Sequence, residues 1–220
     1  MANNVVAYVG ITNFDGIIYL SRILQKLGRK VLLADYSGTG ALRNAIPQLI
    51  ETDSGNSITT FRRVDFTTAE INQEVMDSYD DILIDAGSNQ PCISLLSLTA
   101  IIYVTDMFEF NRKRIEEIKH FDDLLIKKSL LIKSVIDMKI SVDNIILKIQ
   151  GNNLWENVYV IYWDERDYAN SLLCSYSKVP GFLKISAMQK AYLQREIMAL
   201  LPEITRRQLN TAYNKARKGD

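Results

Sequence analysis

Short apolar runs alternate with amphipathic segments along most of this 220-residue chain. The clearest example is residues 5–34, in which an apolar run ends at Gly10 and a second apolar run ends just before Asp35. Between them, apolar positions recur through residues 17–27 at helical spacing, and Gly28 stands where that helix would end. The pattern predicts a strand, a turn, a helix and a second strand, which together form a βαβ unit.

The same alternation continues through the rest of the chain. It predicts further buried strands at residues 81–85, 100–104, 130–136 and 158–162, and a more polar edge strand at residues 58–64. The expected helices are residues 41–50, a helix starting within 65–68 and ending near 78, then 92–98, 110–128, 141–149, 164–174, 186–200 and 205–215. Such alternation predicts a single α/β domain over residues 1–220, with a doubly wound, mostly parallel sheet of about seven strands and helices on both faces.

Composition and charge change this picture little. Hydrophobic residues make up 47% of the chain and charged residues 24%, as in ordinary folded proteins. The formal net charge is +0, so no global field favours nucleic acid or an acidic partner. Cys92 and Cys174 lack metal-type spacing and are expected to be small buried residues in a reducing compartment. No apolar run suits a signal peptide or a membrane span, so we expect a cytoplasmic protein.

Three pieces of the chain occur in an order that is typical of one family. They are GRKVLLAD at residues 28–35, DILIDAG at residues 81–87, and an ending in which a strand, the acidic Asp164, a helix, Ser186 and an AY-containing helix follow one another. This order resembles the MinD/ParA family of deviant Walker A ATPases, which belong to the SIMIBI class of P-loop proteins. The resemblance covers nearly the whole chain. It implies a P-loop NTPase-like fold and face-to-face dimers.

The first turn departs from that family. The family's signature there is KGGxGKT[ST], whereas residues 10–16 read GITNFDG, and residues 5–21 contain no Lys or Arg. The family's catalytic lysine position falls on Asn13, and Asp15 would repel a phosphate that backbone N–H groups and lysine normally hold. Asp15 instead suits the N-terminus of the following helix. We therefore expect no cofactor at this degenerate loop, whose positions are Gly10, Asn13, Asp15 and Gly16.

Asp35 and Asp85 end two of the predicted strands. In the family, acidic residues at such ends contact Mg²⁺ or position water, as expected at the switch point of an open sheet. The alternative is that each carboxylate caps a loop. Because the first turn lacks lysine, we favour the loop-cap interpretation. Residues 85–89 also lack the family's PPG portion, so Asp35, Asp85 and Gly87 are expected to be only vestigial switch positions. We expect no catalytic residue and no metal ligand.

A basic helix is predicted at about residues 205–217. Its small apolar face consists of Leu209, Ala212, Tyr213 and Ala216, and its positive charges are Arg206, Arg207, Lys215, Arg217 and Lys218. Three interpretations are open: a docked or solvated end helix, a surface for a protein partner, or a contact with DNA or an anionic membrane. We favour the first. A late cluster of aromatic residues, Trp155, Tyr159, Tyr162, Trp163 and Tyr168, is expected to pack in the core or an interface.

Taken with the resemblance, these observations predict a non-catalytic MinD/ParA-like protein that acts as a scaffold or localisation factor through protein partners, as a homodimer. Implied settings are pilus or secretion assembly, as in the TadZ/CpaE-like group, cell division and partition, at a cell pole or the membrane periphery. One alternative is an active ATPase that uses ATP and Mg²⁺ in an atypical loop. Another is a DNA- or membrane-binding module acting through the basic helix.

Overall fold

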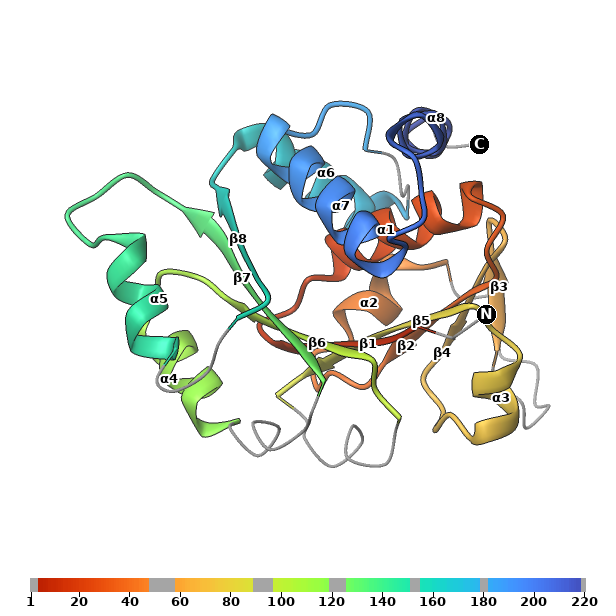
Figure 1. The fold of residues 1–220 in the computed structure, drawn as a ribbon, viewed down its shortest axis with the longest axis horizontal. Coiled ribbons are helices and arrows are strands. Elements are labelled where there is room, and N and C mark those ends of the chain that lie inside the picture. Colours follow the sequence, from red (N-terminus) through yellow and green to blue (C-terminus); the bar gives the residue numbers. More distant parts are fainter. Residues whose placement is uncertain are drawn as a thin grey trace.

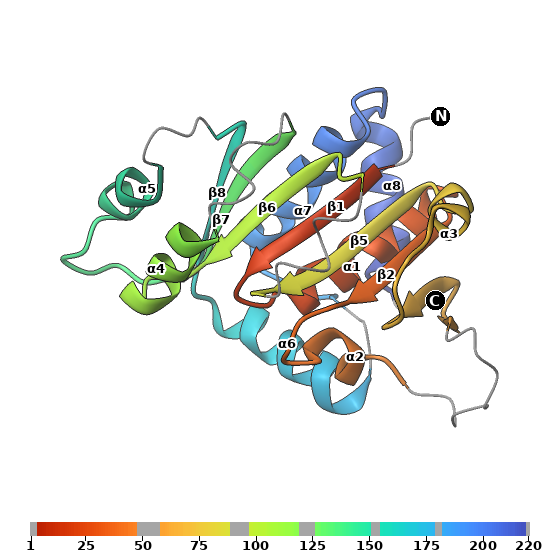
Figure 2. The same cartoon turned by 90° about the horizontal axis from the view of Figure 1, so that it is seen from below.

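The computed structural model describes residues 4–47, 58–88, 97–118, 126–150, 155–178 and 182–218. Within these residues eight strands form one sheet, in the order β3-β4-β2-β5-β1-β6-β7-β8 (Figures 1 and 2). Every neighbouring pair is parallel except β3 and β4, which form an antiparallel hairpin at one edge. The strands are β1 (Asn4–Gly10), β2 (Val31–Asp35), β3 (Thr59–Phe61), β4 (Val64–Thr67), β5 (Asp81–Gly87), β6 (Ala100–Thr105), β7 (Lys127–Val135) and β8 (Asn157–Tyr162).

Strand β1 lies in the middle of the sheet, between β5 and β6. Successive side chains of a strand point to opposite faces, so a central strand covered on both sides needs an unbroken apolar run. Val6 and Tyr8 accordingly belong to one core cluster, and Val5, Ala7 and Val9 belong to the other. The apolar run at the start of the chain thus forms the centre of two cores.

Helices cover both faces of the sheet (Figure 1). Their buried side chains divide between the two core clusters, which shows the face that each helix covers. The predicted doubly wound α/β fold is therefore confirmed. One face carries α1 (Phe14–Lys26), α2 (Ala41–Ala45), α6 (Glu165–Ser177), α7 (Ala187–Leu200) and α8 (Arg206–Ala216); the other carries α3 (Gln73–Asp77), α4 (Glu109–Glu117) and α5 (Val142–Gln150).

The basic helix α8 is docked, as favoured from the sequence. It packs against α1, and its apolar face is buried in the same core cluster as the inner side of α1. Its start is defined by a capping box, in which Thr205 Oγ1 accepts from the Gln208 backbone N–H and the Gln208 side chain accepts from the Thr205 N–H. No helix in the described ranges is both long and apolar enough to span a membrane.

One predicted strand and one predicted helix start are wrong. Residues 58–64 were expected to form a single strand, but the chain turns at Arg62 and Arg63, whose φ angles are 50° and 64°. The chain then returns as β4 (Val64–Thr67), so no helix begins within residues 65–68. Helix α3 starts later, where the Asn72 side chain accepts from the Val75 N–H at 2.9 Å. This edge of the sheet therefore contains two strands, β3 and β4, where the sequence predicted one.

The helix predicted at residues 110–128 is also wrong at its far end. Helix α4 ends at Glu117, and Lys127 begins strand β7, which pairs with β6 and β8. A charged sequence suits a surface helix by propensity, but pairing on both sides outweighs propensity for this segment. Cys174 is buried, as predicted. Asn89, Cys92 and most of the helix predicted at 92–98 lie outside the described residues.

Candidate functional site

The sequence-predicted positions Gly10, Asp35 and Asp85 meet at one edge of the sheet. They lie at or near the carboxyl ends of β1, β2 and β5, three strands that are neighbours in the sheet. Asp35 pairs with Asp85 in the register of β2 and β5. In open α/β sheets, ligands bind at this carboxyl edge, where the direction of winding changes. This edge is the candidate functional site.

The turn after β1 lies tightly against β6. Gly10 has a φ of 119°, and a Cβ atom there would lie 2.2 Å from the carbonyl oxygen of Val104. The next N–H group, that of Ile11, donates to the same carbonyl at 3.0 Å. Gly10 therefore allows close packing between two strands, and one backbone donor of the turn is already used within the protein.

Asn13, at the family's lysine position, points into the protein interior. Its side chain is wholly buried, and Nδ2 donates to the Tyr192 hydroxyl of α7 at 3.3 Å. A Cβ atom on Gly16 would lie 2.6 Å from Asn13 Nδ2, so Gly16 makes room for this side chain. Both glycines of the turn thus serve internal packing.

Asn13 leads to a buried polar cluster between α7 and β8. The rings of Tyr192 and Tyr159 meet edge to face with centroids 5.1 Å apart. One helical turn after Tyr192, Glu196 is only 3% exposed, and burial raises the pKa of its carboxyl group to about 7, while the Tyr159 hydroxyl opposes the shift. The Arg195 guanidinium lies 5.0 Å from the Tyr159 ring centroid. Nothing in the sequence pattern indicated this cluster.

Asp15 lies in the first turn of α1 and is paired. Its Oδ1 accepts from Lys133 Nζ at 2.8 Å and from the Gly16 N–H at 2.9 Å. The carboxylate thus lies in the positive field at the helix N-terminus, as expected of a first-turn acidic residue. Lys133 comes from β7, within the irregularity between Ile132 and Val135, where Ser134 has a φ of 54°. Sequence reasoning missed Lys133, because 118 residues separate the two charges.

Asp85 is completely buried at the end of β5. Its Oδ2 accepts from Thr12 Oγ1 at 2.7 Å, and its Oδ1 accepts from the Gly87 N–H at 3.3 Å. Burial raises the pKa of Asp85 to about 6, with a smaller contribution from the charge of Asp35, and the Thr12 hydrogen bond opposes the shift. Asp85 is therefore held by the turn that follows β1.

Asp35 is engaged by its own loop. Its Oδ1 accepts from the N–H and hydroxyl groups of Ser37 at 3.0 and 2.6 Å, and its Oδ2 accepts from the Arg43 N–H at 2.7 Å. The loop borders an open hollow of about 510 Å³. These contacts match the loop-cap interpretation, because both carboxylate oxygens bind backbone or near neighbours.

These residues fit a nucleoside triphosphate with Mg²⁺ poorly. Such a ligand brings several negative charges, which lysine, Mg²⁺ and free N–H groups normally balance. At this turn the charge of Lys133 is met by Asp15, and the Ile11 and Gly16 N–H groups have internal partners. Within the described ranges, no group of three or more His, Cys, Asp or Glu residues could hold a metal ion.

Comparison with solved structures shows the fold. A chain of the MinC:MinD cell division protein complex from Aquifex aeolicus has a TM-score of 0.63 at 15% identity, covering 92% of this chain and 99% of that one. MinD complexed with Mg-ADP from Pyrococcus horikoshii OT3 has a TM-score of 0.59 at 17% identity, covering 99% and 95%. A ParA family ATPase from Chlorobium tepidum TLS has a TM-score of 0.57 at 15% identity, covering 98% of both chains. No family model and no curated protein sequence matches. The chain thus has the MinD/ParA-like P-loop fold.

Proposed function

We propose that this chain is a non-catalytic protein of MinD/ParA-like fold that acts as a scaffold or localisation factor by association with other proteins. The observation that carries the proposal is the Lys133–Asp15 ion pair at the first turn. A P-loop has uncompensated positive charge at this turn. Here the turn carries the carboxylate of Asp15 instead, and Lys133 neutralises it.

The fold, and a carboxyl edge of the sheet that fits a nucleotide poorly, both support association with protein partners. MinD from Aquifex aeolicus forms a complex with MinC, which illustrates that this fold can associate with another protein. We propose that this chain self-associates without nucleotide, through residues 10–16, 36–40 and 87–89. The proposed settings are partition, cell division, or pilus or secretion assembly, in the cytoplasm, at a cell pole or at the membrane periphery.

A thermal shift experiment tests the absence of nucleotide binding. A ligand that binds the folded state at 100 times its Kd stabilises it by about 2.7 kcal/mol, which gives an easily measured rise in melting temperature. We expect no saturable rise with millimolar Mg-ATP or Mg-ADP, compared with Mg-GTP and Mg²⁺ alone as controls. A saturable rise specific to the adenine nucleotides would instead support the alternative, an ATPase with an atypical loop.

A second candidate function is contact with DNA or an anionic membrane through α8. Arg206, Arg207, Lys215 and Lys218 are exposed on this helix and its end. Its apolar face is buried against α1, so such contact would be electrostatic and sensitive to salt. Retention on duplex DNA or anionic vesicles that is lost in an Arg206→Glu/Arg207→Glu variant would support it. Equal retention of wild type and variant at low salt would exclude these two charges.

A further inference from the structure

Helix α6 presents an apolar side to solvent. Tyr168, Leu172 and Tyr176 follow one another at four-residue spacing and are 58%, 41% and 83% exposed, and Leu173 beside them is 55% exposed. A helix that covers a sheet normally has polar residues on its outer side, because that side stays in water. An apolar row on the outer side of a covering helix indicates an interaction surface.

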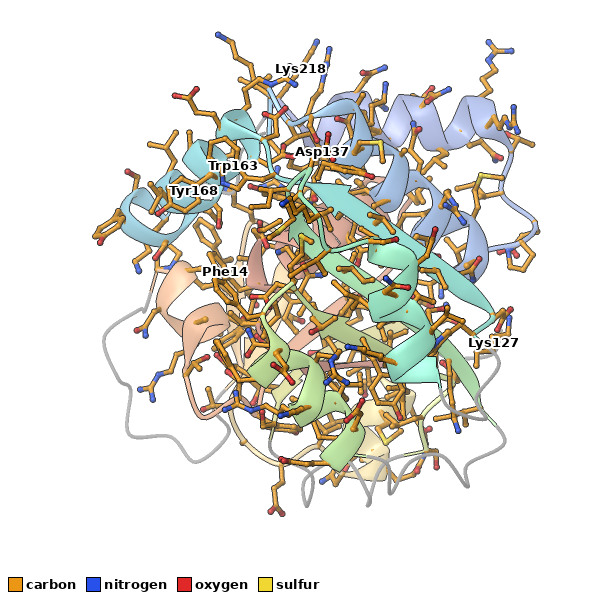
Figure 3. All side chains as sticks on the ribbon, turned by 90° about the vertical axis from the view of Figure 1, so that its left-hand side faces the viewer. Phe14, Lys127, Asp137, Trp163, Tyr168 and Lys218 are labelled. Carbon is orange, nitrogen blue, oxygen red and sulfur yellow. The ribbon has the colours of Figure 1, made fainter. Side chains whose placement is uncertain are left out.

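Trp163 extends this surface beyond the start of the helix. It is 54% exposed and, together with Tyr168, lines a cavity of about 100 Å³ at the carboxyl edge of the sheet. Figure 3 shows the two side chains on the same side of the molecule. A tyrosine or tryptophan buries roughly 150–250 Å² when fully covered, so Trp163, Tyr168 and Tyr176 leave on the order of 400 Å² uncovered. That is about half of one partner's share of a standard interface.

The charges at the two ends of α6 are opposite. Its beginning carries the acidic residues Asp164, Glu165 and Asp167, and its end carries Lys178. Arg166 also lies at the beginning, where it is paired with Asp164. A second α6 running in the opposite direction would bring the acidic start of each helix to the basic end of the other. The helix macrodipoles favour the same antiparallel arrangement. The surface is therefore complementary to itself.

We propose that α6 packs antiparallel against α6 of a second copy of this chain, across a two-fold axis that passes near Leu172. Tyr168 of one copy then lies against Tyr176 of the other, and Glu165 lies near Lys178 of the other. An isologous interface of this kind uses the same surface on both copies. An anionic membrane fits less well, because it would favour basic residues around the apolar row, and this helix starts with three acidic ones.

This inference stands apart from the proposed function. It requires neither an empty nucleotide site nor self-association through the edge loops. Nucleotide binding in the thermal shift experiment would refute the proposed function and leave the α6 interface unaffected. Loss of the α6 interface would conversely leave the non-catalytic interpretation unaffected.

Sedimentation of the full chain over a range of concentrations tests the interface. We expect the wild type to self-associate, and Leu172→Glu to raise the Kd of the association step made by α6 at least about 30-fold, because two leucines covered near the axis become two facing like charges. Association through the edge loops would not respond to this change. The matched control is Leu147→Glu on α5, where the leucine is 67% exposed. It should leave the dimer Kd unchanged. Melting temperatures of both variants check that the fold is intact.

Charge exchange tests the antiparallel orientation. Glu165→Lys places like charges next to Lys178 of the second copy, and Lys178→Glu does the same with Glu165, so each single variant should weaken the dimer at low salt. The double variant restores opposite charges and should recover wild-type affinity. A wild type that stays monomeric at submillimolar concentration would overturn the proposal. The same holds if that monomer binds anionic vesicles and Leu172→Glu removes the binding. So would equal effects of the Leu172 and Leu147 changes, or a double variant no better than the singles.

Discussion

Lys133 Nζ lies 2.8 Å from Asp15 Oδ1, and this ion pair joins strand β7 to the first turn of α1. The two side chains are 16% and 10% exposed, so solvent screens the pair much less than an ordinary surface ion pair. The pair does two things in the folded chain. It neutralises the carboxylate of Asp15, and it ties the turn after β1 to a strand two positions away in the sheet.

Removing the lysine should destabilise the protein. We expect Lys133→Met to lower the free energy of unfolding by about 2–3 kcal/mol, because the largely buried Asp15 carboxylate is left without its partner. The double variant Asp15→Asn/Lys133→Met should lose less than the sum of the two single changes. Urea denaturation of the four proteins measures this coupling. Strictly additive losses would show that the pair contributes nothing beyond its separate residues.

The hydroxyl of Thr12 should control the protonation of Asp85. The Thr12 hydrogen bond opposes the upward shift that burial imposes on the pKa of Asp85, which lies at about 6. Thr12→Val keeps the side-chain shape and removes the donor, so the pKa of Asp85 should rise further. Carbon-detected NMR titration of the carboxyl group measures it, with Thr12→Ser as the control that keeps the donor. An unchanged or lowered pKa in Thr12→Val would contradict the assignment.

Glu196 should make stability depend on pH. Its folded-state pKa of about 7 lies above the ordinary value of 4.5, so between those pH values the folded state holds a proton that the unfolded state has released. Stability from this group is fully present below about pH 4.5 and falls as the pH rises to about 7. The shift corresponds to about 3 kcal/mol. Glu196→Gln should therefore gain about that much relative to wild type between pH 4 and pH 8.

Chemical denaturation at several pH values measures this gain. Glu74→Gln serves as the matched control, because it removes the same charge from an exposed position on α3. Its stability relative to wild type should vary much less with pH. If the Glu196 and Glu74 variants followed the same curve, the buried carboxyl group would not be the source of the dependence.

Gly10 and Gly28 allow a direct comparison of two glycines with positive φ. A Cβ atom on Gly10 would lie 2.2 Å from the Val104 carbonyl oxygen, whereas one on Gly28 would meet nothing within 4 Å. Gly28→Ala should therefore cost about 1 kcal/mol for backbone strain alone. Gly10→Ala should cost at least about 4 kcal/mol, or prevent folding. Melting temperatures of the two variants test this order, and similar values would refute it.

Much of the fold could be predicted from the sequence, because its strands are buried on both faces. Such strands appear as short apolar runs, and β1, β2, β5, β6 and β8 were all expected close to where they lie. The failures came where periodicity is weak. The β3–β4 hairpin depends on left-handed backbone at Arg62 and Arg63, two residue types that carry no turn signal.

The candidate site was predictable in its position but not in its contacts. Strand ends show where Gly10, Asp35 and Asp85 gather, because parallel strands share one carboxyl edge. The partners of these residues come from distant segments: Lys133 from β7 binds Asp15, and Tyr192 from α7 binds Asn13. Only the tertiary packing brings such pairs together, so no local pattern could indicate them.

The packing of α8 against α1 has a consequence for synthesis on the ribosome. During translation, strand β1 likewise waits for the strands that flank it in the sheet, because β5 and β6 follow it by more than seventy residues. At about 5–20 residues per second, the apolar side of α1 emerges on the order of 10–40 s before residues 206–216 are available to cover it. During that interval the nascent chain displays uncovered apolar surface, of the kind that chaperones bind. This protein therefore completes its core only after translation of α8, and any event that releases a shorter chain leaves α1 exposed to aggregation.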